Sequence, residues 1–178
     1  MRPGFILDFN IRKMKRIYKI SVLVLIFIGT FPEIYAQDKQ PEIKYGIGAA
    51  AGFSTGYGLS FRYWPSVWGV QTTFAPYYDE YGATISYGLT GLRLIEDAGW
   101  VRFFGYVSQH LFINQYNDYE TNERKTNITG ITGIGPGLEF IIKQRLGINV
   151  MFGFGLFLDN EDMLMSNLTG EAGIYYRF

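Results

Sequence analysis

Bulky apolar side chains alternate with small or polar ones along most of the chain. Between residues 146 and 157, the even positions carry Leu, Ile, Val and Phe, whereas the odd positions carry mainly Gly, Asn and Met. The same alternation runs through residues 43–53 and 57–63. Successive side chains of a β-strand point to opposite faces. The pattern therefore predicts strands with one bulky apolar face and one small or polar face.

Eight such runs can be delimited, each ending at a turn or a polar cluster. They cover approximately residues 43–53, 57–63, 68–77, 82–94, 100–112, 128–142, 146–157 and 168–178. After residue 36 the sequence shows no sustained helical period with capping residues. The chain is therefore predicted to be all-β, as an eight-stranded antiparallel up-and-down barrel.

The two faces of these strands distinguish a membrane barrel from a soluble one. A soluble barrel directs large apolar side chains inward, whereas a transmembrane barrel directs them toward lipid. The connections "PSV", "EDAG" and "KQR" are tight, and the long polar stretches "NQYNDYETNERKTN" and "DNEDMLMSN" fall at the opposite end. Outer-membrane barrels have short periplasmic turns and longer outside loops. We therefore expect a transmembrane β-barrel.

The first 36 residues have the order of a secretory signal peptide. A basic cluster at residues 12–19 precedes the apolar run "ISVLVLIFIGTF", and Ala36 stands at the expected cleavage position. The apolar run is shorter than the roughly 20 residues that a membrane-spanning helix needs. We predict a cleaved signal peptide over residues 1–36 and a barrel over 37–178, with translation starting at Met1 or Met14.

Composition excludes several classes of function. Loss of the signal peptide removes six cations and two acids from a chain of zero net charge, which leaves about −4. This balance predicts no nucleic-acid partner. The chain has no cysteine, so it must fold without disulfides.

Aromatic residues gather near the tight-turn end of the predicted barrel. Tyr and Trp favour the membrane interface because part of the ring is apolar and part can hydrogen-bond. We predict an aromatic girdle formed by Tyr45, Trp64, Trp68, Trp100, Tyr176 and Phe178.

The eight alternating runs, the girdle and the closing stretch "GEAGIYYRF" together resemble the small OmpA/OmpX-type outer-membrane barrels. The resemblance implies an outer-membrane protein of a Gram-negative bacterium, a monomer in contact with membrane lipids and lipopolysaccharide. It also implies that the last strand is read by the barrel-assembly machinery, with Tyr176 and Phe178 as the insertion signal. Pro136 departs from the pattern because proline cannot donate to a sheet ladder, so we expect a bulge or a local break there.

Charged residues on the inward face are predicted to form a polar network in the lumen. They are Arg62, Arg93, Arg102, Glu139, Glu171 and Arg177. An eight-stranded barrel is just wide enough for its interior to be filled by side chains, so we expect a plug and not an open pore. In the register where paired positions sum to about 241, Glu139 lies opposite Arg102. The tight "EDAG" turn predicts that Arg93 also faces Arg102, which would place one carboxylate between two guanidiniums.

Catalysis and metal binding have few candidate residues. His110 is the only histidine, and Ser108 precedes it by two positions on the same face. The outer-membrane lipid A deacylases resemble this arrangement only weakly, since their serine follows the histidine by two positions and Phe112 stands there. Without a thiol or a second imidazole the sequence predicts no metal site and no cofactor. The acids Asp159, Glu161 and Asp162 are expected to form a solvated loop.

The predicted function is that of a non-enzymatic outer-membrane barrel with a structural or surface-interaction role carried by exposed loops. Loop 113–127, with Tyr116 and Tyr119, is the preferred contact segment. Two alternatives stay open. One is a lipid A-modifying enzyme, and the other is a narrow channel or small-ligand carrier, because inward glycines could leave a cavity.

Overall fold

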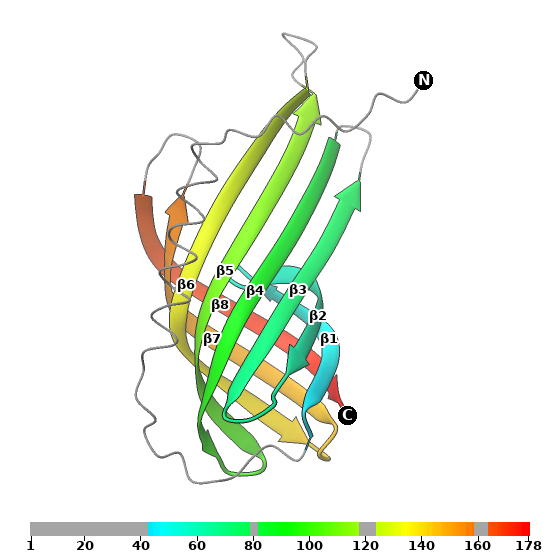
Figure 1. The fold of residues 1–178 in the computed structure, drawn as a ribbon, viewed down its shortest axis with the longest axis vertical. Helices are drawn as coiled ribbons and strands as arrows, with labels where there is room; N and C mark the ends of the chain where they lie inside the picture. Colours follow the sequence, from blue (N-terminus) through cyan, green and yellow to red (C-terminus); the bar gives the residue numbers. More distant parts are fainter. Residues whose placement is uncertain (1–42, 79–81, 118–123, 159–163) are drawn as a thin grey trace.

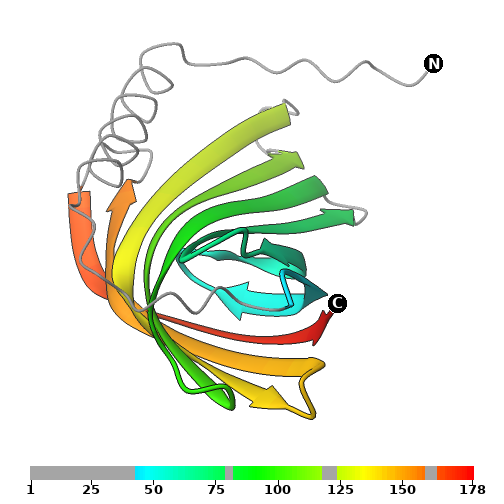
Figure 2. The same ribbon diagram turned by 60° about the horizontal axis from the view of Figure 1, so that its bottom comes forward.

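The chain forms a closed barrel of eight antiparallel strands, which confirms the predicted fold class (Figures 1 and 2). The computed structural model describes residues 43–78, 82–117, 124–158 and 164–178. The strands are β1 (Tyr45–Gly52), β2 (Gly56–Tyr63), β3 (Trp68–Tyr78), β4 (Gly82–Asp97), β5 (Val101–Asn117), β6 (Arg124–Ile142), β7 (Leu146–Leu158) and β8 (Leu164–Arg177). Each strand pairs with its sequence neighbours, and β1 also pairs with β8.

The end of the chain closes the barrel. Beyond the β1–β8 ladder, the Tyr45 amide donates to the Phe178 carbonyl oxygen at 3.1 Å, and the Phe178 amide donates to the Tyr45 carbonyl oxygen at 3.0 Å. A sheet edge presents unpaired backbone groups, which have no water to bind inside a bilayer. The last residue therefore completes the seam that removes the edge.

The strands differ greatly in height. β1 and β2 have 8 residues each, whereas β4, β5 and β6 have 16, 17 and 19, so the long strands rise well beyond the β1–β2 end (Figure 1). The predicted loop 113–127 is mostly strand, since Ile113 pairs with Ile128 and the ladder continues upward to residues 117 and 124. Polar cross-strand contacts support this extension, including one from Gln115 Nε2 to Thr126 Oγ1 at 3.3 Å. Polar side chains on a strand do not end its ladder, and for this reason the loop prediction was wrong for residues 113–117 and 124–127, while residues 118–123 lie outside the described part of the chain.

The ladder between β6 and β7 is interrupted where the sequence predicted a break. Pairing stops after Ile134 and resumes at Gly137 with Met151. Pro136 lies in the gap and retains a register partner, Gly105, only on the β5 side. The missing N–H of proline is therefore placed where no ladder bond is made.

Several predictions lie outside the described residues. These are the signal peptide over 1–36 and the side chains of Tyr119, Asp159, Glu161 and Asp162. Among the residues that the structure describes, none belongs to a helix long and apolar enough to cross a membrane.

Candidate functional site: the closed barrel interior

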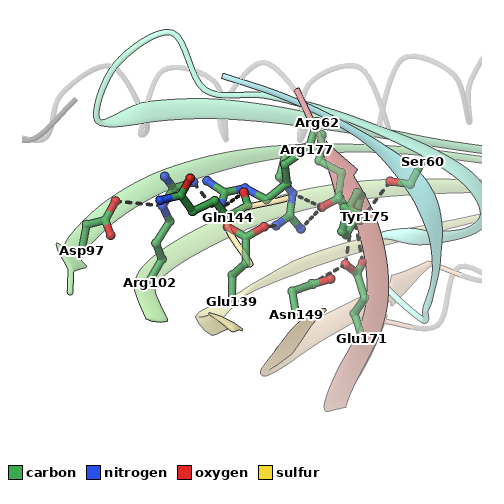
Figure 3. A network of polar contacts seen from close by, with 11 residues as sticks. Ser60, Arg62, Asp97, Arg102, Glu139, Gln144, Asn149, Glu171, Tyr175 and Arg177 are labelled. Atoms are coloured by element: carbon green, nitrogen blue, oxygen red, sulfur yellow. Dashed lines mark hydrogen bonds and ion pairs between the residues drawn. The ribbon is translucent and has the colours of Figure 1, made fainter. Parts of the chain in front are cut away.

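Polar side chains from seven of the eight strands meet inside the barrel and form one network (Figure 3). Its members are Ser60, Arg62, Gln71, Asp97, Arg102, Glu139, Asn149, Glu171, Tyr175 and Arg177. Three are guanidiniums and three are carboxylates, so the formal charges balance. Charges removed from water must be paired or solvated by hydrogen bonds. We call this group the polar network.

Arg62 of β2 occupies the centre of the polar network and is 1 % exposed. Its Nη1 lies 3.3 Å from Oε1 of Glu139, and its Nε donates to Oε1 of Gln71 at 3.1 Å. The guanidinium also lies over the Tyr175 ring, with Cζ 4.3 Å from the ring centroid. Arginine can use its edge for hydrogen bonds and its face for an aromatic ring at the same time. One side chain thereby ties β2 to strands on the far wall.

Glu139 of β6 serves two guanidiniums. Its Oε2 lies 3.6 Å from Nη1 of Arg102, which is its direct register partner on β5 as the sequence predicted. The second guanidinium is that of Arg62, and not that of Arg93 as predicted. Arg102 has a further carboxylate, because its Nε donates to Oδ2 of Asp97 at 2.8 Å.

The second internal carboxylate, Glu171 of β8, is held by amides. Gln71 Nε2 and Asn149 Nδ2 each donate to Glu171 Oε1 at 3.1 Å. On the same strand, the Tyr175 hydroxyl lies 3.0 Å from Ser60 Oγ. These contacts join β2, β3, β7 and β8 across the interior.

The prediction that Arg93 points into the lumen was wrong. Arg93 lies on the outer face of β4, with its guanidinium 5.0 Å from the Trp68 ring centroid. Leu92 and Leu94 are the buried residues beside it. A register shift between Leu94 and Glu96 changes the facing of the strand close to its end. Counting back from the tight turn crosses this bulge, which inverts the assigned face. Arg93 consequently pairs with Gly105 and not with Arg102.

The prediction that Trp64 belongs to the aromatic girdle was also wrong. Trp64 is 3 % exposed and packs inside the barrel, where its ring meets Phe104 edge-on at 5.9 Å between centroids. An apolar cluster surrounds it, made of Leu92, Leu94, Phe104, Tyr106 and Met151. The tight turn after β2 carries Trp64 into the space above Gly69, where a side chain would collide with the indole. Trp64 therefore closes the tight-turn end of the interior and belongs to no girdle.

The other predicted girdle residues lie on the outer face. Tyr45 stacks on Tyr63 at 4.9 Å and on Phe178 at 5.8 Å, and Phe178 in turn stacks with Tyr176 at 6.4 Å. Trp100 is 64 % exposed at the β4–β5 turn. The result is an aromatic row along the tight-turn end, continuous across the β8–β1–β2 seam.

The short turn between β1 and β2 folds into the barrel instead of away from it. Ser54 and Thr55 are 2 % and 1 % exposed. Side chains at Gly88 and Gly133 would collide with the Thr55 backbone and the Ser54 side chain, so these glycines make room for the turn. Residues 53–57 therefore cover the polar network from the long-strand end. We call this segment the inward turn.

The side chains of Ser86 and His110 hold the inward turn at both ends through three hydrogen bonds. The Tyr57 amide donates to Ser86 Oγ at 3.2 Å, and Ser86 Oγ lies 2.9 Å from His110 Nε2. His110 Nδ1 lies 2.8 Å from the Phe53 carbonyl oxygen. A carbonyl can only accept, so Nδ1 carries the proton; in the neutral ring Nε2 then accepts from the Ser86 hydroxyl. The chain of bonds runs from one end of the turn to the other.

The same geometry bears on catalysis. A serine hydroxyl beside an imidazole nitrogen is the arrangement of an activated nucleophile. The serine is Ser86, however, and not the predicted Ser108, whose hydroxyl faces the Gly133 carbonyl oxygen at 3.4 Å. Ser86 is 0 % exposed and already accepts the Tyr57 amide. These side chains thus hold the inward turn. Across the described ranges, no group of three His, Cys, Asp or Glu side chains is placed to hold a metal.

The structure places Arg62, Arg102, Glu139, Glu171 and Arg177 in the interior, each at 6 % exposure or less. Sequence reasoning missed the neutral partners Gln71, Asn149, Tyr175 and Ser60. Each shares the inward parity of its strand, so the alternation that located the charges could also have found them. The inward turn had no comparable signal, because a turn has no alternating faces.

Comparison with known proteins supports the fold. No protein-family model and no curated protein matches the sequence. The N-terminal beta-barrel domain of Pseudomonas aeruginosa OprF superposes with a TM-score of 0.50 at 16% identity, covering 80% of this chain and 100% of that one. The chain has the fold of the small eight-stranded outer-membrane barrels. The resemblance predicted from sequence is therefore confirmed at the level of the fold.

Two further solved structures are similar at lower scores. Neisserial surface protein A (NspA) has a TM-score of 0.47 at 10% identity, covering 76% of this chain and 96% of that one. Ail, the attachment invasion locus protein of Yersinia pestis, has a TM-score of 0.44 at 17% identity with the same coverage.

Proposed function

We propose that this protein is a monomeric integral outer-membrane barrel of a Gram-negative bacterium with a non-enzymatic, structural or surface-contact role. The observation that carries the proposal is the contrast between the apolar outer face of the barrel and its polar interior. Leu59, Phe152, Phe154 and Leu168 are 64–74 % exposed on the outside, while the interior is charged. Soluble monomers rarely expose apolar patches of this extent. Lipid is the environment in which such an exterior is stable.

The aromatic row supports an orientation. In outer-membrane barrels the short turns face the periplasm, and aromatic side chains mark the interface. Tyr45, Tyr176 and Phe178 lie at the tight-turn end, so we assign that end to the periplasm. Tyr176 and Phe178 then serve as the insertion signal for the barrel-assembly machinery, and the outer surface contacts lipid and lipopolysaccharide.

The packed interior favours a structural role over a channel. Arg62, Glu139 and Tyr175 cross the lumen, Trp64 fills its periplasmic end, and the inward turn covers the other end. A path for ions would have to pass all three layers. Neighbouring atoms fill the space beside the inward glycines that suggested a cavity. The Phe104 ring, for example, fills the space beside Gly137.

The long strands supply the surface for contacts. β4, β5 and β6 rise beyond β1 and β2 as a sheet whose polar residues include Asn114, Gln115 and Thr126 (Figure 1). With the orientation above, this sheet projects outside the cell. Rigid strands present side chains at lower entropic cost than a flexible loop does.

Fractionation and gel migration test the proposal. We expect the protein in the outer membrane, with different migration before and after boiling, because a closed barrel resists detergent until heated. A soluble periplasmic protein that migrates identically in both lanes would overturn it. Lipid A from cells with and without the protein should be identical in mass, and an acyl-chain difference would show an enzyme instead.

A further inference from the structure

A groove of about 350 Å³ crosses the outer face of β3–β6, outside the interior already described. Its lining is almost wholly apolar, and among the described residues that line it Arg93 is the one charged side chain. Ligand pockets in proteins typically occupy roughly 300–1,000 Å³. We call this feature the outer groove. Its main walls are Trp68, Ile95, Val107, Ile134 and Pro136.

The groove exists because glycine replaces the bulky outward residues found elsewhere on the barrel. Gly105 pairs with Arg93 on one side and with Pro136 on the other. A Cβ atom at Gly105 would meet only Ile95 Cδ1, at 3.9 Å. The second outward glycine is Gly91, the next outward position up the strand from Arg93. The floor of the groove at these two glycines is therefore backbone, and at Gly105 it is open to the surface.

Arg93 makes the groove unlike the rest of the lipid-facing wall. A cation on the outer face of a barrel is destabilising toward the bilayer centre and tolerated near the interface. Trp68, on which Arg93 lies, begins β3 directly after a tight turn. The charge thus sits at the level of the aromatic row. Gly91, Val107 and Ile134 line the groove on the side of Arg93 toward the membrane centre, and Ile95 lines it on the turn side.

From this arrangement we propose that the outer groove binds an anionic glycerophospholipid, with the acyl chain along the two glycines and the phosphate at Arg93. The proposal rests on the proposed function and specifies one lipid site. The apolar trough complements a hydrocarbon chain, and the guanidinium edge complements a phosphate. A lipid of the periplasm-facing leaflet presents its phosphate at this level.

Tryptophan quenching tests the site in the folded full-length barrel. The probe is phosphatidylglycerol with brominated acyl chains, added to protein in dodecylmaltoside micelles, because bromine quenches an indole that it touches. A Trp100→Phe background removes the exposed indole, and Trp64 is enclosed. The signal then reports on Trp68 in the groove wall.

Two variants should weaken binding. We expect Arg93→Gln to raise the half-quenching concentration about tenfold, which corresponds to about 1.4 kcal/mol, because the charge-assisted hydrogen bond to the phosphate is lost. Gly105→Ile should raise it at least as much by filling the trough, and Gly105→Ala should give an intermediate shift. The control for Arg93→Gln is Arg145→Gln, at an exposed arginine that donates to the Tyr176 hydroxyl at the same end of the barrel. The control for Gly105→Ile is Gly170→Ile, at an outward glycine of β8 with comparable space around it. Both controls should leave the curve unchanged.

Several outcomes would overturn the site. The first is the same quenching curve for Gly105→Ile and Gly170→Ile. The second is the same quenching curve for Arg93→Gln and Arg145→Gln. The third is quenching by brominated phosphatidylcholine that equals quenching by brominated phosphatidylglycerol. A dimer that excludes the probe from Trp68 would assign the groove to a second copy instead. The heat-dependent gel shift separates the two proposals. If the parent protein shows the heat-dependent gel shift but the quenching curves of the groove variants coincide with those of their controls, only the lipid site is overturned. If the parent protein shows no gel shift, the proposal of a membrane barrel is overturned.

Discussion

Arg62 and Glu139 face each other across the barrel from β2 and β6, with Nη1 and Oε1 3.3 Å apart and both residues 1 % exposed. These strands are four apart in a ring of eight, so the pair spans opposite walls. A buried ion pair contributes little net stability when it forms, but it leaves a costly unpaired charge when one partner is removed. The interior is therefore sensitive to single substitutions.

Glu139→Leu should lower the free energy of unfolding by about 3–5 kcal/mol, the typical cost of leaving a buried charge unpaired. Glu96→Leu, at an exposed carboxylate near the β4–β5 turn, is the control and should change little. Urea titration of the folded barrel in detergent, followed by the gel shift, measures both midpoints. Equal midpoints for Glu139→Leu and the parent would contradict the assigned network.

Second substitutions should rescue Glu139→Leu unequally. Arg102 retains Asp97 at 2.8 Å after the loss of Glu139, whereas the carboxylate in direct contact with Arg62 is Glu139. Adding Arg62→Met should therefore recover more stability than adding Arg102→Met, with a coupling energy of roughly 0.5–3 kcal/mol. The same urea titrations give the comparison. If Arg102→Met rescues better, the shared carboxylate belongs mainly to Arg102.

Loss of the imidazole should release the inward turn. The chain has no natural cysteine, so Ser54→Cys provides one label site for a water-soluble maleimide. Adding His110→Leu should speed labelling about tenfold or more, because the bonds lost contribute roughly 1–3 kcal/mol. Ala98→Cys, on the exposed β4–β5 turn, should react rapidly in both backgrounds. Unchanged labelling at Ser54→Cys would mean that His110 does not hold the turn.

A methyl group at Gly88 provides an independent route to the same release. It would overlap the Thr55 carbonyl oxygen, so Gly88→Ala should also speed labelling of Ser54→Cys. Overpacking typically costs about 1–3 kcal/mol. Gly46→Ala is the control, since its nearest neighbour would be Tyr175 Cβ at an ordinary 3.6 Å. Equally slow labelling in both variants would show that a methyl group at Gly88 does not displace the turn, whereas fast labelling of Ser54→Cys in the parent background would place the turn outside the barrel.

Conductance should be absent in the parent protein and should stay absent when only the inward turn is released. The polar network around Arg62 lies beneath the turn and blocks the lumen by itself. In planar bilayers we therefore expect no single-channel events from the parent or from His110→Leu. Discrete openings of the parent would support the narrow-channel alternative.

An outward substitution distinguishes lipid from water around the barrel. Leu59→Arg, at a residue that is 74 % exposed in the middle of β2, should cost about 2–4 kcal/mol in a lipid-facing barrel. On a water-exposed surface the same change is usually within about 0.5 kcal/mol of neutral. Ala98→Arg at the tight turn should be neutral in either case. Equal stability of Leu59→Arg and Ala98→Arg in lipid vesicles would reject the membrane face.

The sequence by itself determined the strands, their facing and most of the internal charges. Alternation is a local property with a period of two, so each run assigns its own residues to inside or outside. Arg62, Glu171 and Arg177 were placed correctly for this reason, and the β5–β6 register followed from a hairpin with no bulge.

Only the tertiary structure decided the features that depend on turns and on distant strands. A one-residue bulge after Leu94 moved Arg93 to the outer face and so created the charge in the outer groove. The turns that carry Trp64 and Thr55 inward are set by space beside Gly69 and Gly88, on strands reached only when the barrel closes. Arg62 and Glu139 are 77 positions apart in the chain, and their contact follows from the ring of eight strands, which no local pattern encodes.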